Sequence, residues 1–361
     1  MARRPRERRR SDDCRQLHHG TEERRRRRRR LHVLANDCDR GFSVYALNVD
    51  HFDSDDDDMD SRARRSRRIV RLAGKSAQRF VAVGTRIFDL YPSSSDRPSI
   101  VFDTRTRLVA TPPPFQTPKE FAAFWAVGRA VYALECRLGF RGRTRHGCFE
   151  RLGREPRPGH GKWEWEALPS PPFEPNVVVS HAVHPDGATV FLSVHRAGTF
   201  SFDADRLAWA RHGGWLLPFD GKAHYVGELG AWVGISSRVV GHIAACPVPD
   251  GCCHDDDEAA AVAEPACKYG KDLLFSKKLE RHLDANLTYM GGAEFCLQET
   301  LTTEGETMAS TFGLMVRMLL RVVTFRVEYS ADGELCAVNR RAIIYKLPHH
   351  SSERRPFAFW I

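Results

Sequence analysis

The sequence predicts an all-β fold built from repeated four-stranded units, and two observations carry this prediction. From Phe80 onward, short apolar runs alternate with dense turn signals, and little helical periodicity is sustained. A motif made of an apolar run, a glycine-containing turn and a second apolar run also recurs, with its glycines at Gly84, Gly128, Gly187, Gly230 and Gly292. Their spacings of 44, 59, 43 and 62 residues are typical of β-propeller blades of about 40–50 residues with insertions.

The recurring motif predicts two adjacent antiparallel strands joined by a tight turn. It reads "FVAVGTRIFDL" at 80–90 and "FWAVGRAVYAL" at 124–134, and looser versions occur at 181–194, 228–235 and 287–297. Glycine adopts the positive φ that a short hairpin needs without steric cost. We therefore expect structural turn roles for Gly84, Gly128, Gly187 and Gly292.

A second motif predicts the third and fourth strands of a blade. "SIVFDTRTRLVA" at 99–110 and "TFSFDADRLAWA" at 199–210 share a strand, a Phe-Asp pair and a polar turn. The carboxylates of Asp103 and Asp203 can accept hydrogen bonds from backbone two residues on and close these turns. With a further unit in 31–50 and a hairpin at Asp332-Gly333, the sequence predicts about six blades, within a range of five to seven.

These motifs, together with "WEWEALPSPPF", "HGGWLLPF" and the closing "FAFWI", resemble a large family of grass proteins that look like divergent kelch-type β-propellers. The resemblance covers about 31–361 and implies a single propeller domain. Because a propeller ring must close, we expect strands from the two ends of the chain to share one blade. It implies no catalytic residues. The sequence departs from regular kelch repeats because a paired glycine survives only at Gly291-Gly292.

The basic charge lies in an N-terminal tail. Residues 1–30 contain fourteen arginines and five acids, so they hold the whole net charge of +9. We expect this tail to be disordered. Its arginine block is a candidate nuclear-import or anion-binding segment, formed by Arg24, Arg25, Arg26, Arg27, Arg28, Arg29 and Arg30.

Three further segments of biased composition are expected as loops of the propeller. They are an Asp/Arg loop at 50–71, a basic insertion at 137–162 and a Cys/acidic insertion at 246–267. Long loops on a propeller gather on its faces, where targets bind. The basic insertion therefore supplies a candidate interaction loop, with Arg141, Arg143, Arg145, Arg151 and Arg154 as its contact residues.

No catalytic or metal-binding constellation is predicted. "GKS" at 74–76 lacks the preceding glycine of a phosphate loop, and neither GxSxG nor HExxH occurs. His181 and His184 are three apart on a predicted strand, which places them on opposite faces. Adjacent Cys252 and Cys253 do not easily aim both thiolates at one zinc ion. We expect no cofactor.

The leading functional hypothesis is a non-catalytic module or adaptor that binds an unknown protein partner. The alternatives are a metabolite- or sugar-binding or enzymatic propeller with its site in the central channel, and sequence-nonspecific nucleic-acid contact through the tail. Nothing in the tail resembles a signal peptide and no apolar run has the length of a membrane span. We therefore expect a nuclear or cytoplasmic protein with a monomeric body and no membrane partner.

Overall fold

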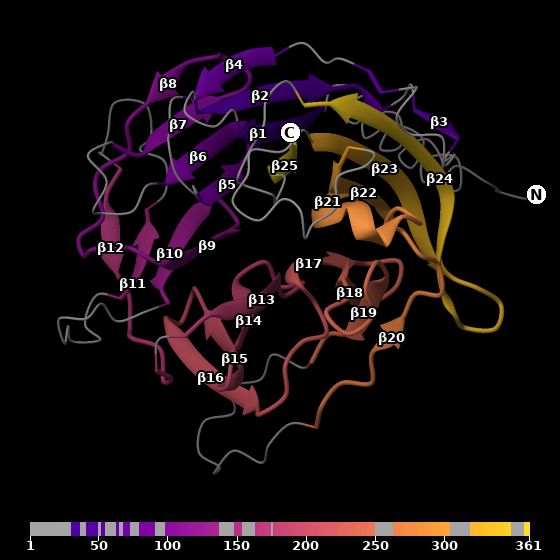
Figure 1. The fold of residues 1–361 in the computed structure, drawn as a ribbon. Coiled ribbons are helices and arrows are strands. Elements are labelled where there is room, and N and C mark those ends of the chain that lie inside the picture. The colour runs from indigo at the N-terminus through magenta and orange to yellow at the C-terminus, as the bar shows by residue number, and fades with distance from the viewer. Residues whose placement is uncertain are drawn as a thin grey trace, which may run out of the picture.

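The structure is a computed structural model, and it places the strands as blades around one centre (Figure 1). It describes residues 30–36, 41–49, 52–54, 63–64, 68–72, 79–90, 98–136, 148–153, 163–174, 176–249, 263–303, 318–347 and 357–361. The described strands form six blades, each with four strands in antiparallel order. The prediction of an all-β propeller of about six four-stranded blades is confirmed.

The first three blades are separate four-stranded sheets, whose strands follow one another from the centre of the ring outward. Blade 1 contains β25 (Phe357–Trp360), β1 (Leu31–Asn36), β2 (Phe42–Leu47) and β4 (Arg68–Leu72). Blade 2 contains β5 (Arg79–Val83), β6 (Arg86–Leu90), β7 (Ile100–Asp103) and β8 (Val109–Ala110). Blade 3 contains β9 (Ala122–Val127), β10 (Ala130–Glu135), β11 (Phe149–Leu152) and β12 (Trp165–Ala167).

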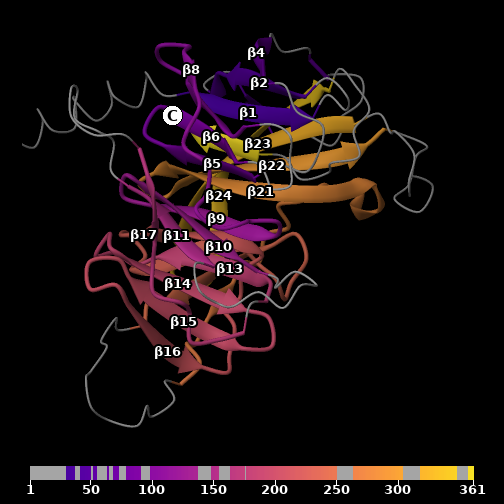
Figure 2. The same cartoon turned by 90° about the vertical axis from the view of Figure 1, so that its left-hand side faces the viewer.

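The remaining three blades follow in chain order. Blade 4 contains β13 (Val178–Val183), β14 (Thr189–Val194), β15 (Gly198–Asp203) and β16 (Ala208–Gly213). Blade 5 contains β17 (Gly221–Val226), β18 (Ala231–Ile235), β19 (Ile243–Pro247) and β20 (Lys268–Tyr269). A short 3-10 helix at Leu279–Arg281 precedes blade 6, which contains β21 (His282–Gly291), β22 (Glu294–Thr302), β23 (Met318–Tyr329) and β24 (Leu335–Lys346). The side view shows β13 to β16 lying in order from the centre to the edge (Figure 2).

Strands from the two ends of the chain close the ring in blade 1, as predicted. β25 pairs antiparallel with β1, with Leu31 opposite Trp360 and Val33 opposite Ala358. The backbone N–H of Arg30 donates to the carbonyl of Ile361 at 2.8 Å, so Arg30 already belongs to the edge of this sheet. The N-terminal and C-terminal segments therefore hold each other in place, and β1 has a partner strand on both sides.

Two of the predicted loops contain strands. Within 50–71, β3 (Asp53–Ser54) pairs with the outer strand β24 of blade 6, and β4 starts at Arg68. Within 137–162, β11 pairs with both β10 and β12. The dense arginines hide this strand in the sequence, although Phe149 and Leu152 are buried. The third predicted loop, 246–267, starts inside β19 with Cys246.

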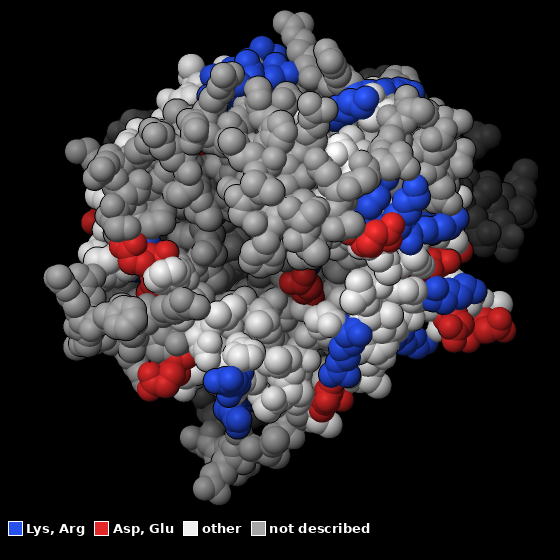
Figure 3. All heavy atoms as spheres, viewed as in Figure 1, with Lys and Arg blue, Asp and Glu red and all other residues white. Residues whose placement is uncertain are grey.

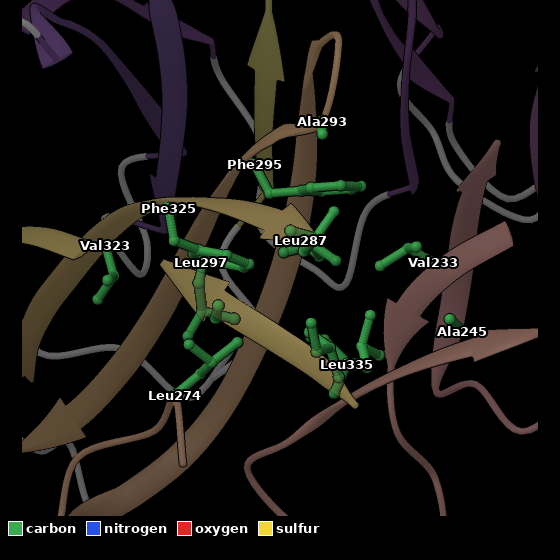
Figure 4. Close-up of a cluster of buried hydrophobic side chains, with 14 of the residues drawn as sticks. Val233, Ala245, Leu274, Leu287, Ala293, Phe295, Leu297, Val323, Phe325 and Leu335 are labelled. Carbon is green, nitrogen blue, oxygen red and sulfur yellow. The ribbon is translucent and has the colours of Figure 1, made fainter. Parts of the chain in front are cut away.

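One apolar cluster fills the space between each pair of neighbouring blades, which gives six clusters around the ring. The cluster between blades 5 and 6 shows the pattern (Figure 4). Val233 and Ala245 of blade 5 meet Leu287, Phe295 and Leu297 of blade 6 there. Alternate residues of each strand point to opposite faces of its sheet, so every blade contributes to two clusters. This repeated burial is what holds the blades in a ring.

Candidate functional site: a groove across blade 3

The candidate site lies on one face of the propeller, here called the turn face. It is the face at which the first and second strands, and the third and fourth strands, of blades 2 to 6 are connected. In blades 2 and 3 the first connection is a two-residue turn, with Val83 opposite Arg86 and Val127 opposite Ala130. Gly84 and Gly128 have φ of 59° and 58° there, where a residue with a side chain would be strained.

The other predicted turn residues also lie in the turns of this face. Gly187 and Gly292 have φ of 75° and 61°. The Asp103 carboxylate accepts hydrogen bonds from the N–H groups of Arg105 and Thr106, at 2.9 and 3.1 Å. The Asp203 carboxylate accepts from Asp205 and Arg206 in the same way, at 2.8 and 3.0 Å. These residues shape the turns and leave the neighbouring side chains to make contacts.

A first hollow of about 320 Å³ opens on the turn face between blades 2 and 3. Its apolar floor is formed by Val83, Phe88, Val131, Leu152 and Trp163. The Arg86 guanidinium lies over the Trp163 ring, 5.5 Å from its centroid, and Arg129 closes the other side. Arg86 Nε lies 3.7 Å from Asp103 Oδ2, so Arg129 is the cation that this hollow offers to an apolar group with an attached negative charge.

A second hollow of about 850 Å³ lies between blades 3 and 4, and it shares Gly128, Arg129 and Gly153 with the first. Its lining is more polar and includes Glu166, Asp186 and Asp205. The two hollows form one surface feature, here called the blade 3 groove. The lining of the first hollow is basic, whereas that of the second has more acidic than basic residues. This difference would orient a bound segment that carries charges of both signs.

Arg151, a predicted contact residue, lines the second hollow but is held by the protein itself. Its Nη2 lies 2.7 Å from Glu166 Oε2, and its Nη1 donates to the Ala204 carbonyl at 3.5 Å. A hydrogen bond links the guanidinium to the Tyr132 hydroxyl, whose pKa is raised by burial. Arg151 therefore shapes the wall of the groove and is not available as a freely offered cation.

Arg129 is the residue that sequence reasoning missed. It occupies the tip of the β9–β10 turn, is exposed and lines both hollows. Within the described part of the chain it makes no ion pair. The signal was present in the sequence, because Arg129 directly follows the turn glycine Gly128 and hairpin tips point away from the sheet.

Several predicted contact residues lie outside the described residues. These are Arg141, Arg143, Arg145 and Arg154 of the basic insertion, and Arg24, Arg25, Arg26, Arg27, Arg28 and Arg29 of the tail. The described surface is not dominated by one charge: basic and acidic side chains alternate over the visible described part (Figure 3). This agrees with the neutral charge balance counted for the body.

The histidines and cysteines considered as metal ligands do not converge in the described regions. His184 lies in the β13–β14 turn, where its Nδ1 is 2.9 Å from Asp186 Oδ2, while His181 lies within β13. Cys252, Cys253 and His254 are outside the described residues. No group of three or more His, Cys, Asp or Glu side chains that could hold a metal ion occurs among the residues that the structure describes.

Cys246 and Cys267 form a pair of interacting thiols at the edge of blade 5. The register of β19 and β20 places them opposite each other, one step beyond Ala245 and Lys268. Their mutual hydrogen bond raises the pKa of buried Cys246 and lowers the pKa of half-buried Cys267. The Arg238 guanidinium, ion-paired to Glu264, lowers the pKa of Cys267 further. Cys267 is therefore the more acidic thiol.

Cys267 is expected to react with iodoacetamide before the other described cysteines, because alkylation requires a thiolate and solvent access. Peptide mass mapping after brief labelling measures this order. Cys246→Ala should slow the labelling of Cys267 by removing its hydrogen-bond donor. Earlier labelling of buried Cys148, or unchanged kinetics in Cys246→Ala, would contradict the assignment.

The fold and groove define this protein as a six-bladed β-propeller with a recessed surface on its turn face. The chain belongs to a family described as "Protein of unknown function (DUF1668)", whose model matches residues 28–345. No curated protein matches the chain in sequence. A chain in the solved structure titled "Crystal structure of Nidogen/Laminin Complex" is similar at 8% sequence identity and a TM-score of 0.44, covering 91% of this chain and 98% of that chain.

Among the described residues, no helix is both long and apolar enough to cross a membrane.

Proposed function

We propose that this protein is a non-catalytic interaction module that binds an extended segment of a partner protein in the blade 3 groove. The observation that carries the proposal is the position of Arg129, an exposed cation between two hollows. Recessed apolar surface beside a cation that has no ion-pair partner among the described residues is a common basis of peptide recognition.

The two hollows indicate the chemistry of the segment. The first would take an apolar side chain against Phe88 and Trp163, next to a carboxylate that pairs with Arg129. The second would take a basic residue near Asp186 and Asp205. A segment with an apolar-acidic pair followed by a basic residue fits both. The rigid β-hairpins on which the lining residues lie favour binding without rearrangement.

One polar pair has the geometry of a nucleophilic pair but lies out of reach of a substrate. Ser201 and His212 are within hydrogen-bonding distance, with 2.8 Å between Oγ and Nε2, which is a geometry suited to nucleophilic catalysis. Both side chains are nevertheless buried inside blade 4, so a substrate cannot reach the hydroxyl. Their contact instead satisfies two buried polar groups.

The proposal includes the finer expectations drawn from the sequence. These are a kelch-type and grass-family origin of the fold and a nuclear or cytoplasmic location. Sequence-nonspecific nucleic-acid contact through the arginine tail remains an alternative function, and it would not use the groove. The failure of any of these expectations would not count against binding in the groove, because the groove is formed by residues of blades 2, 3 and 4 alone.

Arg129→Glu is expected to weaken peptide binding in the groove. Selection of random short peptides on the full-length protein should enrich sequences with an apolar residue beside Asp or Glu. Reversing the charge of Arg129 should then weaken the selected peptides at least about tenfold, which equals about 1.4 kcal/mol.

The matched control is Arg211→Glu, which reverses another exposed arginine, on the outer strand of blade 4. Selected peptides should bind this variant as they bind the wild type. The proposal is wrong if no peptide is enriched, or if the enriched peptides bind Arg129→Glu with unchanged affinity.

A further inference from the structure

A second set of polar side chains faces the axis of the ring, away from the blade 3 groove. It begins where the sheets of blades 4 and 5 join, because their innermost strands β13 and β17 pair in parallel. In this register Ser180 lies beside Gly221, His181 beside Lys222, and Ala182 beside Ala223. Paired residues of parallel strands project to the same side of the sheet, so His181 and Lys222 are neighbours about 4.8 Å apart.

The burial of the flanking alanines shows which side this is. Ala182 and Ala223 both lie in the apolar cluster between blades 4 and 5. His181 and Lys222 therefore project to the opposite side, and so does His224, two residues beyond Lys222. These three side chains are here called the axial row. They come from two adjacent inner strands that line the centre of the ring (Figure 1).

Aromatic rings from the neighbouring blades hold the two ends of the axial row. The His181 ring lies 6.3 Å from the Trp125 ring of blade 3, measured between centroids. The His224 ring stacks on Tyr289 of blade 6, with centroids 5.6 Å apart and an angle of 28° between planes. Four blades thus contribute to one site, and the imidazole orientations are fixed by packing.

The axial row combines a lysine with two imidazoles that are neutral at neutral pH. Desolvation and, as the smaller cause, the neighbouring Lys222 together lower the pKa of His181 to about 3. Desolvation and Lys222 also hold the pKa of His224 well below its ordinary value. The surrounding blades lower the pKa of the Lys222 amine, yet the side chain keeps contact with solvent. An anion at the centre of the ring can therefore reach the Lys222 side chain.

The hydrogen bonds of His224 leave one acceptor unused. The ring bonds the backbone carbonyl of Leu287, which requires an N–H donor on the ring. Its Nε2 is buried and has no hydrogen-bond partner. In a neutral imidazole one nitrogen donates and the other accepts, so Nε2 carries the lone pair. A ligand that satisfies both Lys222 and Nε2 must present a negative oxygen and an O–H group together.

We propose that the axial row binds a phosphate group, either free or carried by a small metabolite. Inorganic phosphate near neutral pH keeps a P–O–H group beside its charged oxygens, whereas a phosphate monoester keeps one only in its monoanion, below a second pKa of about 6. Lys222 would pair with the charged oxygen and Nε2 of His224 would accept from the P–O–H group. Sulfate offers the same size and charge without the proton, so it should bind more weakly.

This inference uses residues of blades 3, 4, 5 and 6 around the axis and does not depend on the blade 3 groove.

The test is a titration of the full-length protein with inorganic phosphate, sulfate and glycerol 3-phosphate. Binding is measured by calorimetry and by the imidazole NMR signals of His181 and His224. Phosphate should saturate with a dissociation constant of about 1 mM or tighter. Lys222→Met should weaken it at least about tenfold, whereas the surface control Lys271→Met should not. His224→Phe keeps the stacking on Tyr289 and should remove the preference for phosphate over sulfate.

The outcomes separate the two sources of the group. Tighter binding of glycerol 3-phosphate assigns the site to a phosphorylated metabolite, and tighter binding of inorganic phosphate assigns it to the free ion. The proposal is overturned if the wild type shows no saturable response to any probe up to about 20 mM, or if Lys222→Met and Lys271→Met bind equally. Should Lys222→Met fold poorly, the wild-type titration and His224→Phe decide.

Discussion

Glu150→Gln is expected to lower the free energy of unfolding by about 3–5 kcal/mol, because it leaves a buried cation without its partner. Lys119 Nζ lies 2.5 Å from Glu150 Oε1, and both side chains are fully buried. The same carboxylate accepts the backbone N–H groups of Gln116 and Thr117, each at 2.9 Å. It therefore fixes the segment that leads into the first strand of blade 3.

Denaturant unfolding of the single and double variants measures the effect. Lys119→Met combined with Glu150→Gln should recover part of the stability, since no unpaired charge then remains. A loss below about 1 kcal/mol for Glu150→Gln, or strictly additive effects in the double variant, would show that the ion pair does not hold this segment.

Asp89→Asn is expected to stabilise the protein at pH 7 by about 2–4 kcal/mol. Asp89 is 1% exposed, and neither of its carboxylate oxygens has a hydrogen-bond partner. Burial raises its pKa to about 8 from an ordinary value of 3.8. The Asp89 side chain projects to the same side of its sheet as Ile87, toward blade 1. At the corresponding position of the second strand, blade 4 has Leu192 and blade 6 has Leu297.

The sign follows from the direction of the shift. Between pH 3.8 and about 8 the folded state keeps a proton on Asp89 that the unfolded state releases. The contribution of Asp89 to the free energy of unfolding is therefore most favourable below pH 3.8, and it falls as the pH rises to about 8. Asp89→Asn should flatten that decline, and Asp89→Leu should stabilise further unless its larger side chain strains the packing. A wild-type stability that does not fall between pH 5 and pH 8, roughly the span of the shift, would contradict this.

The sequence was sufficient for the architecture because each blade repeats the same local chemistry. The glycine turns, the Phe-Asp turns and the apolar alternation are local signals, and they located the strands of blades 2 to 6. Strand β11 was missed because seven arginines lie in and around its short apolar pattern, and β3 because its pairing with β24 joins distant parts of the chain.

The sites were less predictable because they depend on contacts between blades. Arg129 and Trp163 meet in one hollow although 33 residues separate them in the chain. His181 and Lys222 become neighbours only through the parallel pairing of β13 with β17. Arg151 was predicted as a contact residue from composition, and its ion pair with Glu166 could not be inferred from charge alone.

Site-specific photo-crosslinking in living cells tests most directly whether the blade 3 groove binds a partner. A photoreactive amino acid would replace Thr85 beside the first hollow or, as a control, Val240 in the β18–β19 connection, which is 67% exposed. We predict a discrete cross-linked protein from position 85 that is lost when Arg129→Glu is added, and none from position 240. Cross-links from position 240 alone, or a product at position 85 that is unaffected by Arg129→Glu, would contradict the account.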